Sequence, residues 1–221
     1  MEYFTIQKNN QSKYKPVCKS VLIGNLNSGK TTLCKKLMGI EKETTSPTVG
    51  IDFCTINLKS FKLHIVDTAG HERYSELVNS YWKNAYYIIG VISLASTEIN
   101  ASVKSMIKYL DKLQKEENES FIILWFSKLD LYSENQLKKE VIIDQLKFDY
   151  EELFTHPYVI NHLLDLFVVN QKDKKDIDIN KKMLIDLLTT NYYLGELKTT
   201  STISLNNYCN LKSKTDCCSL I

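Results

Sequence analysis

The sequence contains almost no arginine, since Arg73 is the only arginine among its 28 basic residues. Arginine binds a phosphate through two parallel hydrogen bonds, and lysine lacks the planar fork that this requires. An arginine cluster for phosphate binding is therefore excluded, and the scarcity argues against nucleotide kinases, whose lids usually carry several arginines. The net charge is only +2, so no nucleic-acid binding is expected.

Long hydrophobic runs are missing as well. The longest lies around residues 86–95 and is far shorter than the roughly 20 residues that cross a bilayer, so no membrane-spanning helix is expected. Residues 1–16 are polar and charged, unlike a signal peptide. Cys18, Cys34 and Cys54 are therefore interpreted as reduced, intracellular thiols.

What the sequence does contain is a regular alternation of short apolar runs and amphipathic stretches. The expected strands cover residues 17–23, 53–58, 61–66, 87–94, 121–126 and 166–169. The expected helices cover residues 31–38, 75–84, 98–116, 135–147 and 176–190. This alternation predicts an α/β fold with a mostly parallel six-stranded sheet and helices on both faces. The connection over residues 57–61 is too short for a crossover, so one antiparallel edge strand is expected.

A chain of 221 residues is long enough for one well-buried domain with a tail. We expect an N-terminal extension over residues 1–16 and one domain over residues 17–195. A flexible tether is expected over residues 196–221, where Thr, Ser, Asn and Lys dominate. Ligands of such a domain bind at the carboxyl ends of its parallel strands.

Residues 24–31 directly follow the first apolar run and fit the pattern G-x-x-x-x-G-K-[ST]. In such a loop, backbone N–H groups, the N-terminus of the next helix and a lysine direct positive potential at one anion. We therefore expect nucleotide phosphates to be bound by Asn27, Ser28, Gly29, Lys30, Thr31 and Thr32. The Thr31 hydroxyl is also a candidate ligand of Mg²⁺, a hard cation that prefers oxygen. The alternative is a glycine-rich surface turn.

Two further motifs follow the third and fifth expected strands. Asp67 begins D-T-A-G, where its carboxylate can hold a Mg²⁺-bound water and the Gly70 N–H can reach a terminal phosphate. Asp130 ends Ser-Lys-Leu-Asp, and its carboxylate can accept two hydrogen bonds from guanine that adenine cannot offer in that arrangement. Each motif is weak by itself, but their order and spacing together favour a guanine-nucleotide site.

With these motifs in this order, the chain resembles a small GTPase of the Ras superfamily, and most of all the Rab family, over about residues 17–190 and the tail. Residues 48–53 resemble switch I, and residues 67–74 resemble switch II. The aromatic stretch 80–85 is similar to one that follows switch II in Rabs. The resemblance implies the P-loop NTPase (small G-protein) fold, with GTP or GDP and Mg²⁺ as ligands of the domain.

The resemblance also implies roles for individual residues. Thr48 is implied as a second hydroxyl ligand of Mg²⁺, beside Thr31 and Asp67. Rabs usually place a glutamine after D-T-A-G to orient the water that attacks the γ-phosphate, whereas this chain has His71. The implied catalytic residues are His71, Lys30 and Gly70.

Departures in the phosphate region affect hydrolysis more than binding. In Ras-like proteins, a histidine at the position of His71 tends to slow hydrolysis. Leu26 crowds the space beside the γ-phosphate where an activating protein inserts an arginine, whereas Asn27 tolerates a positive φ better than most residues. Arg73 is interpreted as part of a structural ion pair, so a catalytic arginine has to come from a partner. We therefore expect nucleotide binding with slow intrinsic hydrolysis.

The base-recognition motifs depart from the family pattern too. Ser127 replaces the usual asparagine and lacks the amide that bridges base and phosphate loop, while Lys128 and Asp130 remain. The last motif, normally S-A-K, is represented only by Asn170, Gln171 and Lys172. The segment over residues 131–165 is longer than the family norm, and no function is assigned to it.

The chain ends in Cys217-Cys218-Ser219-Leu220-Ile221, which fits both a C-a-a-X box and the double-cysteine ending of Rabs. One prenyl chain anchors a protein reversibly and two anchor it stably, so Cys217 and Cys218 predict lipid anchoring. The terminal Ile221 favours geranylgeranyl over farnesyl. We expect the protein on the cytoplasmic face of an intracellular membrane, with a cytosolic pool. The alternative is two ordinary surface thiols.

The sequence thus predicts a Rab-like guanine-nucleotide switch that hydrolyses GTP slowly and regulates vesicle traffic. We expect the protein to be monomeric. Its expected partners are effectors, an exchange factor, a GTPase-activating protein, and prenyl-transfer and membrane-extraction chaperones. An alternative of another class is a degenerate GTP-binding adaptor with little or no hydrolysis. A third reading is a P-loop kinase, which would prefer ATP.

Overall fold

The computed structural model describes residues 15–40, 47–71 and 74–200. The chain divides into two compact units, one that ends at Asn180 and one that begins at Lys181. The first unit holds the sheet and the nucleotide-binding motifs, and the second contributes the later part of the last helix. The boundaries expected at residues 16 and 195 stay predictions.

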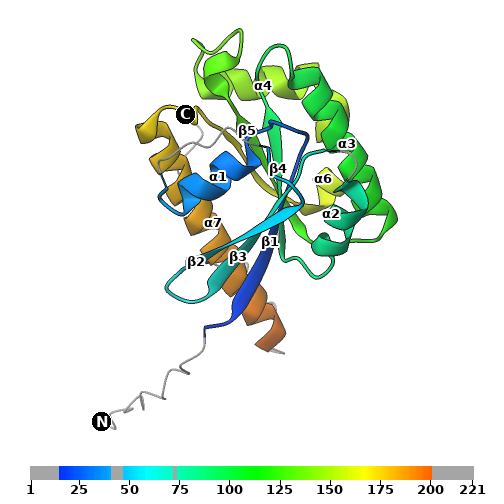
Figure 1. Ribbon diagram of the computed structural model, residues 1–221, viewed down its shortest axis with the longest axis vertical. Helices are drawn as coiled ribbons and strands as arrows, with labels where there is room; N and C mark the ends of the chain where they lie inside the picture. The colour runs from blue at the N-terminus through cyan, green and yellow to red at the C-terminus, as the bar shows by residue number, and fades with distance from the viewer. Residues whose placement is uncertain (1–14, 41–46, 72–73, 201–221) are drawn as a thin grey trace, which may run out of the picture. The chain divides into compact units, whose positions relative to one another are not determined.

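The sheet has six strands in the order β2-β3-β1-β4-β5-β6 (Figure 1). The strands are β1 (Val17–Ile23), β2 (Ile51–Asn57), β3 (Lys62–Thr68), β4 (Tyr87–Ser93), β5 (Phe121–Ser127) and β6 (Leu163–Val168). β2 runs antiparallel to β3, and every other neighbouring pair is parallel. The prediction of a mostly parallel sheet with one antiparallel edge strand is confirmed. Every residue of β4 is buried. Because both faces of this strand are covered, its sequence is almost entirely apolar and does not alternate with polar residues.

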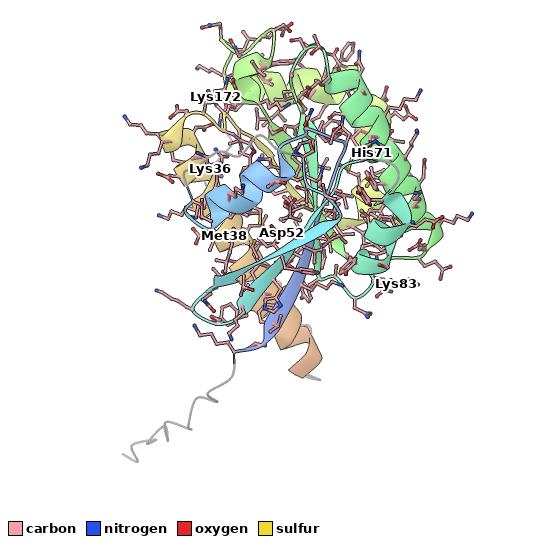
Figure 2. The ribbon with its side chains drawn as sticks, viewed as in Figure 1. Lys36, Met38, Asp52, His71, Lys83 and Lys172 are labelled. Atoms are coloured by element: carbon pink, nitrogen blue, oxygen red, sulfur yellow. The ribbon has the colours of Figure 1, made fainter. Side chains whose placement is uncertain are left out.

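The helices are α1 (Lys30–Leu37), α2 (Ser75–Trp82), α3 (Ile99–Lys115), α4 (Lys139–Asp149), α5 (Glu151–Phe154), α6 (Pro157–His162) and α7 (Lys174–Thr200). A 3₁₀ turn covers Leu129–Leu131. α1 lies on one face of the sheet, and α2 and α3 lie on the other (Figure 1). Figure 2 shows the same division, with Lys36 beside α1 and Lys83 after α2 on the opposite side. The prediction of helices on both faces is confirmed.

The two short helices α5 and α6 are absent from the sequence-based prediction. They contain 4 and 6 residues, too few for a period of 3.6 residues to be visible. Pro157 in the first turn of α6 is a local signal for its start, and the ring of His156 accepts a hydrogen bond from the Tyr158 N–H at 3.2 Å. The neighbouring boundaries also differ from expectation, since α4 begins at Lys139 and β6 begins at Leu163.

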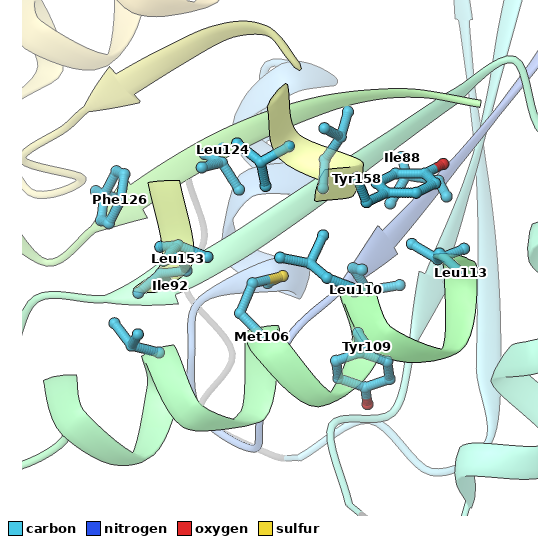
Figure 3. Close-up of a cluster of buried hydrophobic side chains, with 14 of the residues drawn as sticks. Ile88, Ile92, Met106, Tyr109, Leu110, Leu113, Leu124, Phe126, Leu153 and Tyr158 are labelled. Carbon is cyan, nitrogen blue, oxygen red and sulfur yellow. The ribbon is translucent and has the colours of Figure 1, made fainter. Parts of the chain in front are cut away.

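The main core of the first unit lies between α3 and the sheet, and it includes side chains of the long segment 131–165. Figure 3 shows Met106 and Leu110 of α3 in one cluster with Leu153 of α5 and Tyr158 of α6. Contacts of α6 with α3, β5 and β6 extend this packing. The long segment is therefore part of the core of the first unit.

Within the described residues, no helix combines the length and the apolar character that crossing a bilayer requires. Cys18, Cys34 and Cys54 are free thiols and buried. Burial raises the pKa of Cys18 to about 12, so this thiol stays protonated and unreactive.

Candidate functional site

The phosphate loop is the turn over residues 24–29 that joins β1 to α1. Its backbone is left-handed at Gly24 (φ 147°), Asn27 (φ 60°) and Gly29 (φ 97°). Asparagine adopts this conformation more readily than most residues, which suits Asn27 to its position. A β-carbon on Gly24 would lie 2.3 Å from the Val91 carbonyl oxygen. The loop therefore requires glycine where it leaves the strand.

Lys30 begins α1 and turns back over this loop. Its side chain is 5% exposed, and Nζ donates to the carbonyl oxygens of Gly24 at 2.9 Å and Asn25 at 2.8 Å. Burial lowers the pKa of Lys30 to about 8, against the opposing charge of Asp67. The ammonium group is therefore held here at an energetic cost, which an anion bound beside it would offset.

Three oxygen-bearing side chains meet at the N-terminus of α1. Thr31 Oγ1 donates to Asp67 Oδ2 at 2.6 Å and lies 2.6 Å from Thr48 Oγ1. Asp67 is buried, and its Oδ1 has no hydrogen-bond partner among the described residues. Burial raises the pKa of Asp67, and the hydrogen bond from Thr31 opposes this effect. An unpaired carboxylate oxygen beside two hydroxyls fits a hard divalent cation such as Mg²⁺.

A cavity of about 320 Å³ opens beside the phosphate loop. The predicted site residues that line it are Asn27, Gly29, Lys30, Thr31, Thr32, Thr48, Gly70, Lys128 and Gln171. The lining residues that were not predicted as site residues are Leu26, Pro47, Thr68 and Glu98. The cavity lies where β1, β3 and β5 end, as expected for a mostly parallel sheet.

Ser127 is buried at the end of β5 and does not line the cavity. Its hydroxyl donates to the Ser28 carbonyl oxygen at 2.6 Å. The hydroxyl therefore connects β5 to the phosphate loop, although the family's amide is missing. Ser28 is itself buried, so its predicted contribution to phosphate binding rests on its backbone.

Lys128 forms an ion pair that the sequence does not reveal. Its Nζ lies 2.8 Å from Glu98 Oε2, and Glu98 also accepts a hydrogen bond from Ser93 Oγ at 2.7 Å. Burial raises the pKa of Glu98, but the hydrogen bonds from Lys128 and Ser93 outweigh burial and hold it below its ordinary value. Glu98 therefore faces the cavity as an anion and positions Lys128. No sequence motif marks this pair, because 30 residues separate the partners.

Asn170, Gln171 and Lys172 form the turn between β6 and α7. Lys172 Nζ lies 2.8 Å from Asp130 Oδ2, which brings the third motif against the Asp130 carboxylate. The Asn170 N–H donates to Asp176 Oδ2 at 2.7 Å, which fixes the start of the turn. Gln171 lines the cavity, whereas Asn170, Lys172 and Asp130 are not among its lining residues.

The D-T-A-G segment meets the phosphate loop at Gly70. A β-carbon on Gly70 would lie 2.4 Å from the Asn25 carbonyl oxygen, so a larger residue would push the two segments apart. His71 is exposed and does not line the cavity, and it lies on the α2 and α3 side of the molecule (Figure 2). Arg73 lies outside the described residues, so its ion pair stays a prediction.

Comparison with known proteins identifies similar sequences. The model of the Ras family matches residues 19–153, more than half of the chain. The chain is 32% identical over 130 residues to the Ras-related protein RABC2a of Arabidopsis thaliana, a match that covers 57% of this chain and 53% of that protein. It is 32% identical over 164 residues to the ADP-ribosylation factor-like protein 2 of Dictyostelium discoideum, covering 72% of this chain and 84% of that protein.

A third relative is the Ras-related protein Rab-12 of Homo sapiens, with 30% identity over 125 residues, 54% of this chain and 50% of that protein. The chain thus spans about half the length of the two Ras-related relatives, 53% and 50%.

Proposed function

This chain belongs to the Ras family as a divergent, Rab-like small GTPase, and from that premise we propose that it is a guanine-nucleotide switch in membrane traffic. In this proposal it binds GTP or GDP with Mg²⁺, hydrolyses GTP slowly and acts through effectors. The observation that carries the proposal is the cluster of Thr31, Thr48 and Asp67 beside the cavity, which is lined by Lys30, Thr31 and Thr48.

The proposed mechanism gives each of these residues one task. Lys30 and the N–H groups of the phosphate loop bind the terminal phosphates, while Thr31, Thr48 and Asp67 hold Mg²⁺. Bound Mg²⁺ neutralises the charge that develops on the phosphates. Thr48 and Gly70 lie on the two segments that resemble the switches, so loss of the terminal phosphate removes a partner from both segments and releases them.

Slow hydrolysis follows from His71, which the proposal places where the family orients the attacking water with glutamine. We expect His71→Gln to raise the single-turnover rate of GTP hydrolysis by about ten- to a hundredfold, because correct positioning of the attacking water accelerates the reaction by roughly this factor. The matched control is His64→Gln, the same change at an exposed residue of β3. Equal rates for wild type and His71→Gln would remove His71 from the proposed mechanism.

The competing function is an adaptor that binds GTP and scarcely hydrolyses it. Leu26 favours this reading, because it is an exposed leucine in the cavity lining, beside the space that a partner's arginine would enter. Hydrolysis measured with an activating protein separates the two functions. Stimulated turnover of the wild type would reject the adaptor, whereas turnover that appears only in Leu26→Gly would favour it. A preference for ATP over GTP would revive the kinase reading.

The proposed effector surface includes two neighbouring rings on β2 and α2. Phe53 is 62% exposed, and its ring centroid lies 5.7 Å from that of Tyr81. Val66, which takes the place of a tryptophan usual in Rabs, pairs with Phe53 across the strands but is buried. The exposed ring of Phe53 and the half-buried ring of Tyr81 therefore lie side by side, which supports binding of an effector with an apolar contact surface.

Lipid anchoring is proposed at Cys217 and Cys218, which lie outside the described residues. We expect mass spectrometry of the protein from cells to find geranylgeranyl groups on both thiols, because stable attachment requires two chains. Replacing both cysteines by serine is expected to move the protein from the membrane fraction to the soluble fraction. An unmodified full-length C-terminus in cells would contradict the proposal.

A further inference from the structure

The side chain of Asn25 connects the phosphate loop to α3. Its Oδ1 accepts a hydrogen bond from Ser102 Oγ at 2.7 Å, and 77 residues separate the two partners. Asn25 is half-buried and is not among the residues that line the cavity. Its side chain is thus engaged with α3, and any effect of Asn25 on a nucleotide passes through its backbone.

The position of the Ser102 hydroxyl is fixed by the sheet. Ser102 lies in the first turn of α3 and is 1% exposed. Its Oγ accepts a hydrogen bond from the Ser93 N–H at 3.0 Å, at the end of β4. Since a hydroxyl has one proton and two lone pairs, this contact leaves the proton for Asn25. The end of β4 and the start of α3 therefore determine where Asn25 Oδ1 lies.

The backbone of Asn25 contacts two groups to which the proposed function assigns the phosphates. Its carbonyl oxygen accepts a hydrogen bond from Lys30 Nζ at 2.8 Å. A β-carbon on Gly70 would overlap this carbonyl group and the backbone nitrogen of Leu26. Gly70 therefore lies directly against the peptide bond between Asn25 and Leu26. A shift of this peptide bond would move the carbonyl partner of Lys30 and the surface against which Gly70 packs.

These two groups reach different parts of a nucleotide. The lysine of a phosphate loop reaches the β- and γ-phosphates, so GDP and GTP both contact it. The N–H of Gly70 can reach only the terminal phosphate of GTP, which GDP lacks. Displacement of the peptide bond that Gly70 packs against is therefore expected to weaken binding of a triphosphate more than binding of a diphosphate.

We propose that Asn25 and Ser102 are a pair of positioning residues that holds the peptide bond between Asn25 and Leu26 where Gly70 can bind the terminal phosphate. The hydrogen bond between the two side chains fixes the loop before the nucleotide arrives, which lowers the cost of ordering it on binding. The pair therefore favours the triphosphate over the diphosphate. This inference rests on the proposed function, since it requires Gly70 to contact the terminal phosphate.

The test compares two nucleotides on the wild type and four variants. The nucleotides are GDP and guanosine 5′-[β,γ-imido]triphosphate, which is not hydrolysed. The variants are Asn25→Ala, Ser102→Ala, the double variant, and Ser105→Ala as the matched control. Ser105 is a half-buried residue of the same helix and does not line the cavity. Affinities are measured by calorimetry with Mg²⁺ present.

We expect Asn25→Ala and Ser102→Ala each to lose about tenfold in affinity for the triphosphate analogue, near the upper limit for one hydrogen bond. The loss for GDP is expected to stay below about threefold, and Ser105→Ala is expected to bind both nucleotides like the wild type. The double variant is expected to lose no more than either single variant, because both changes remove the same hydrogen bond. A purely structural role would lower both affinities by the same factor.

An unchanged ratio of the two affinities in Asn25→Ala overturns the inference. This variant keeps the acceptor of the Ser93 N–H, so it decides the question even where Ser102→Ala does not fold. Losses that add in the double variant also overturn the inference, because the two residues then act separately. A wild type that binds neither nucleotide overturns the proposed function itself.

Discussion

Lys30→Ala is expected to weaken GDP binding by about a thousandfold, which would abolish retention of the nucleotide during gel filtration. The estimate is about 4 kcal/mol for removing one partner of a buried, hydrogen-bonded charge pair, at 1.4 kcal/mol for each factor of ten. The ammonium group of Lys30 is buried and lies over the phosphate loop, within 3 Å of the Gly24 and Asn25 carbonyl oxygens. Burial lowers the pKa of Lys30, which means that the buried charge does not stabilise the fold.

The control for this prediction is Lys104→Ala, which removes an exposed lysine from α3 and leaves the cavity unchanged. Lys30→Met serves as a second variant, because it keeps the apolar stem that fills the space under the loop. Thermal unfolding of each variant without nucleotide reports whether the variant is folded. Normal retention of GDP by a folded Lys30→Ala or Lys30→Met protein would refute the phosphate site.

The strands and the mostly parallel character of the sheet could be predicted because their signals are local. The unbroken apolar runs of β4 and β5 follow from burial on both faces. The short connection before Phe61 leaves room only for a hairpin, and β2 and β3 are indeed antiparallel. The motif over residues 24–31, which contains the phosphate loop and the first two residues of α1, is equally local, because its glycines and its lysine have to stand at fixed positions in one short segment.

Contacts between distant segments could not be predicted in the same way. The pairing of Lys128 with Glu98 depends on how β5 and the start of α3 are placed. The motif marks Lys128, but no sequence signal marks Glu98 as its partner. The Ser127 hydroxyl donates to the Ser28 carbonyl oxygen and so connects β5 to the phosphate loop, as the family's asparagine amide does. This contact depends on the position of the phosphate loop, which the sequence does not show. Sequence patterns name the residue types at a site, whereas the packing of the strands decides which of them meet.

Tyr158 anchors the long segment 131–165 in the core of the first unit. Tyr158→Ala is expected to lower the free energy of unfolding by about 3–5 kcal/mol, the range for truncating a large buried aromatic side chain. Tyr158 is 1% exposed and packs in the cluster with Leu110 and Leu153 (Figure 3). Its hydroxyl lies 2.8 Å from the Ser120 carbonyl oxygen. Urea denaturation monitored by circular dichroism measures the change.

The matched control is Phe148→Ala in α4, an aromatic residue of the same segment that is 82% exposed. Its truncation is expected to change the free energy of unfolding by less than about 0.5 kcal/mol. Tyr158→Phe removes only the hydroxyl and is expected to cost about 1 kcal/mol, the worth of one buried hydrogen bond. If Tyr158→Ala is no more destabilising than Phe148→Ala, the segment does not belong to the core. We expect the free energy of unfolding of Tyr158→Ala to be well below those of Phe148→Ala and Tyr158→Phe. This order would mean that the segment cannot be shortened to the family length without repacking α3.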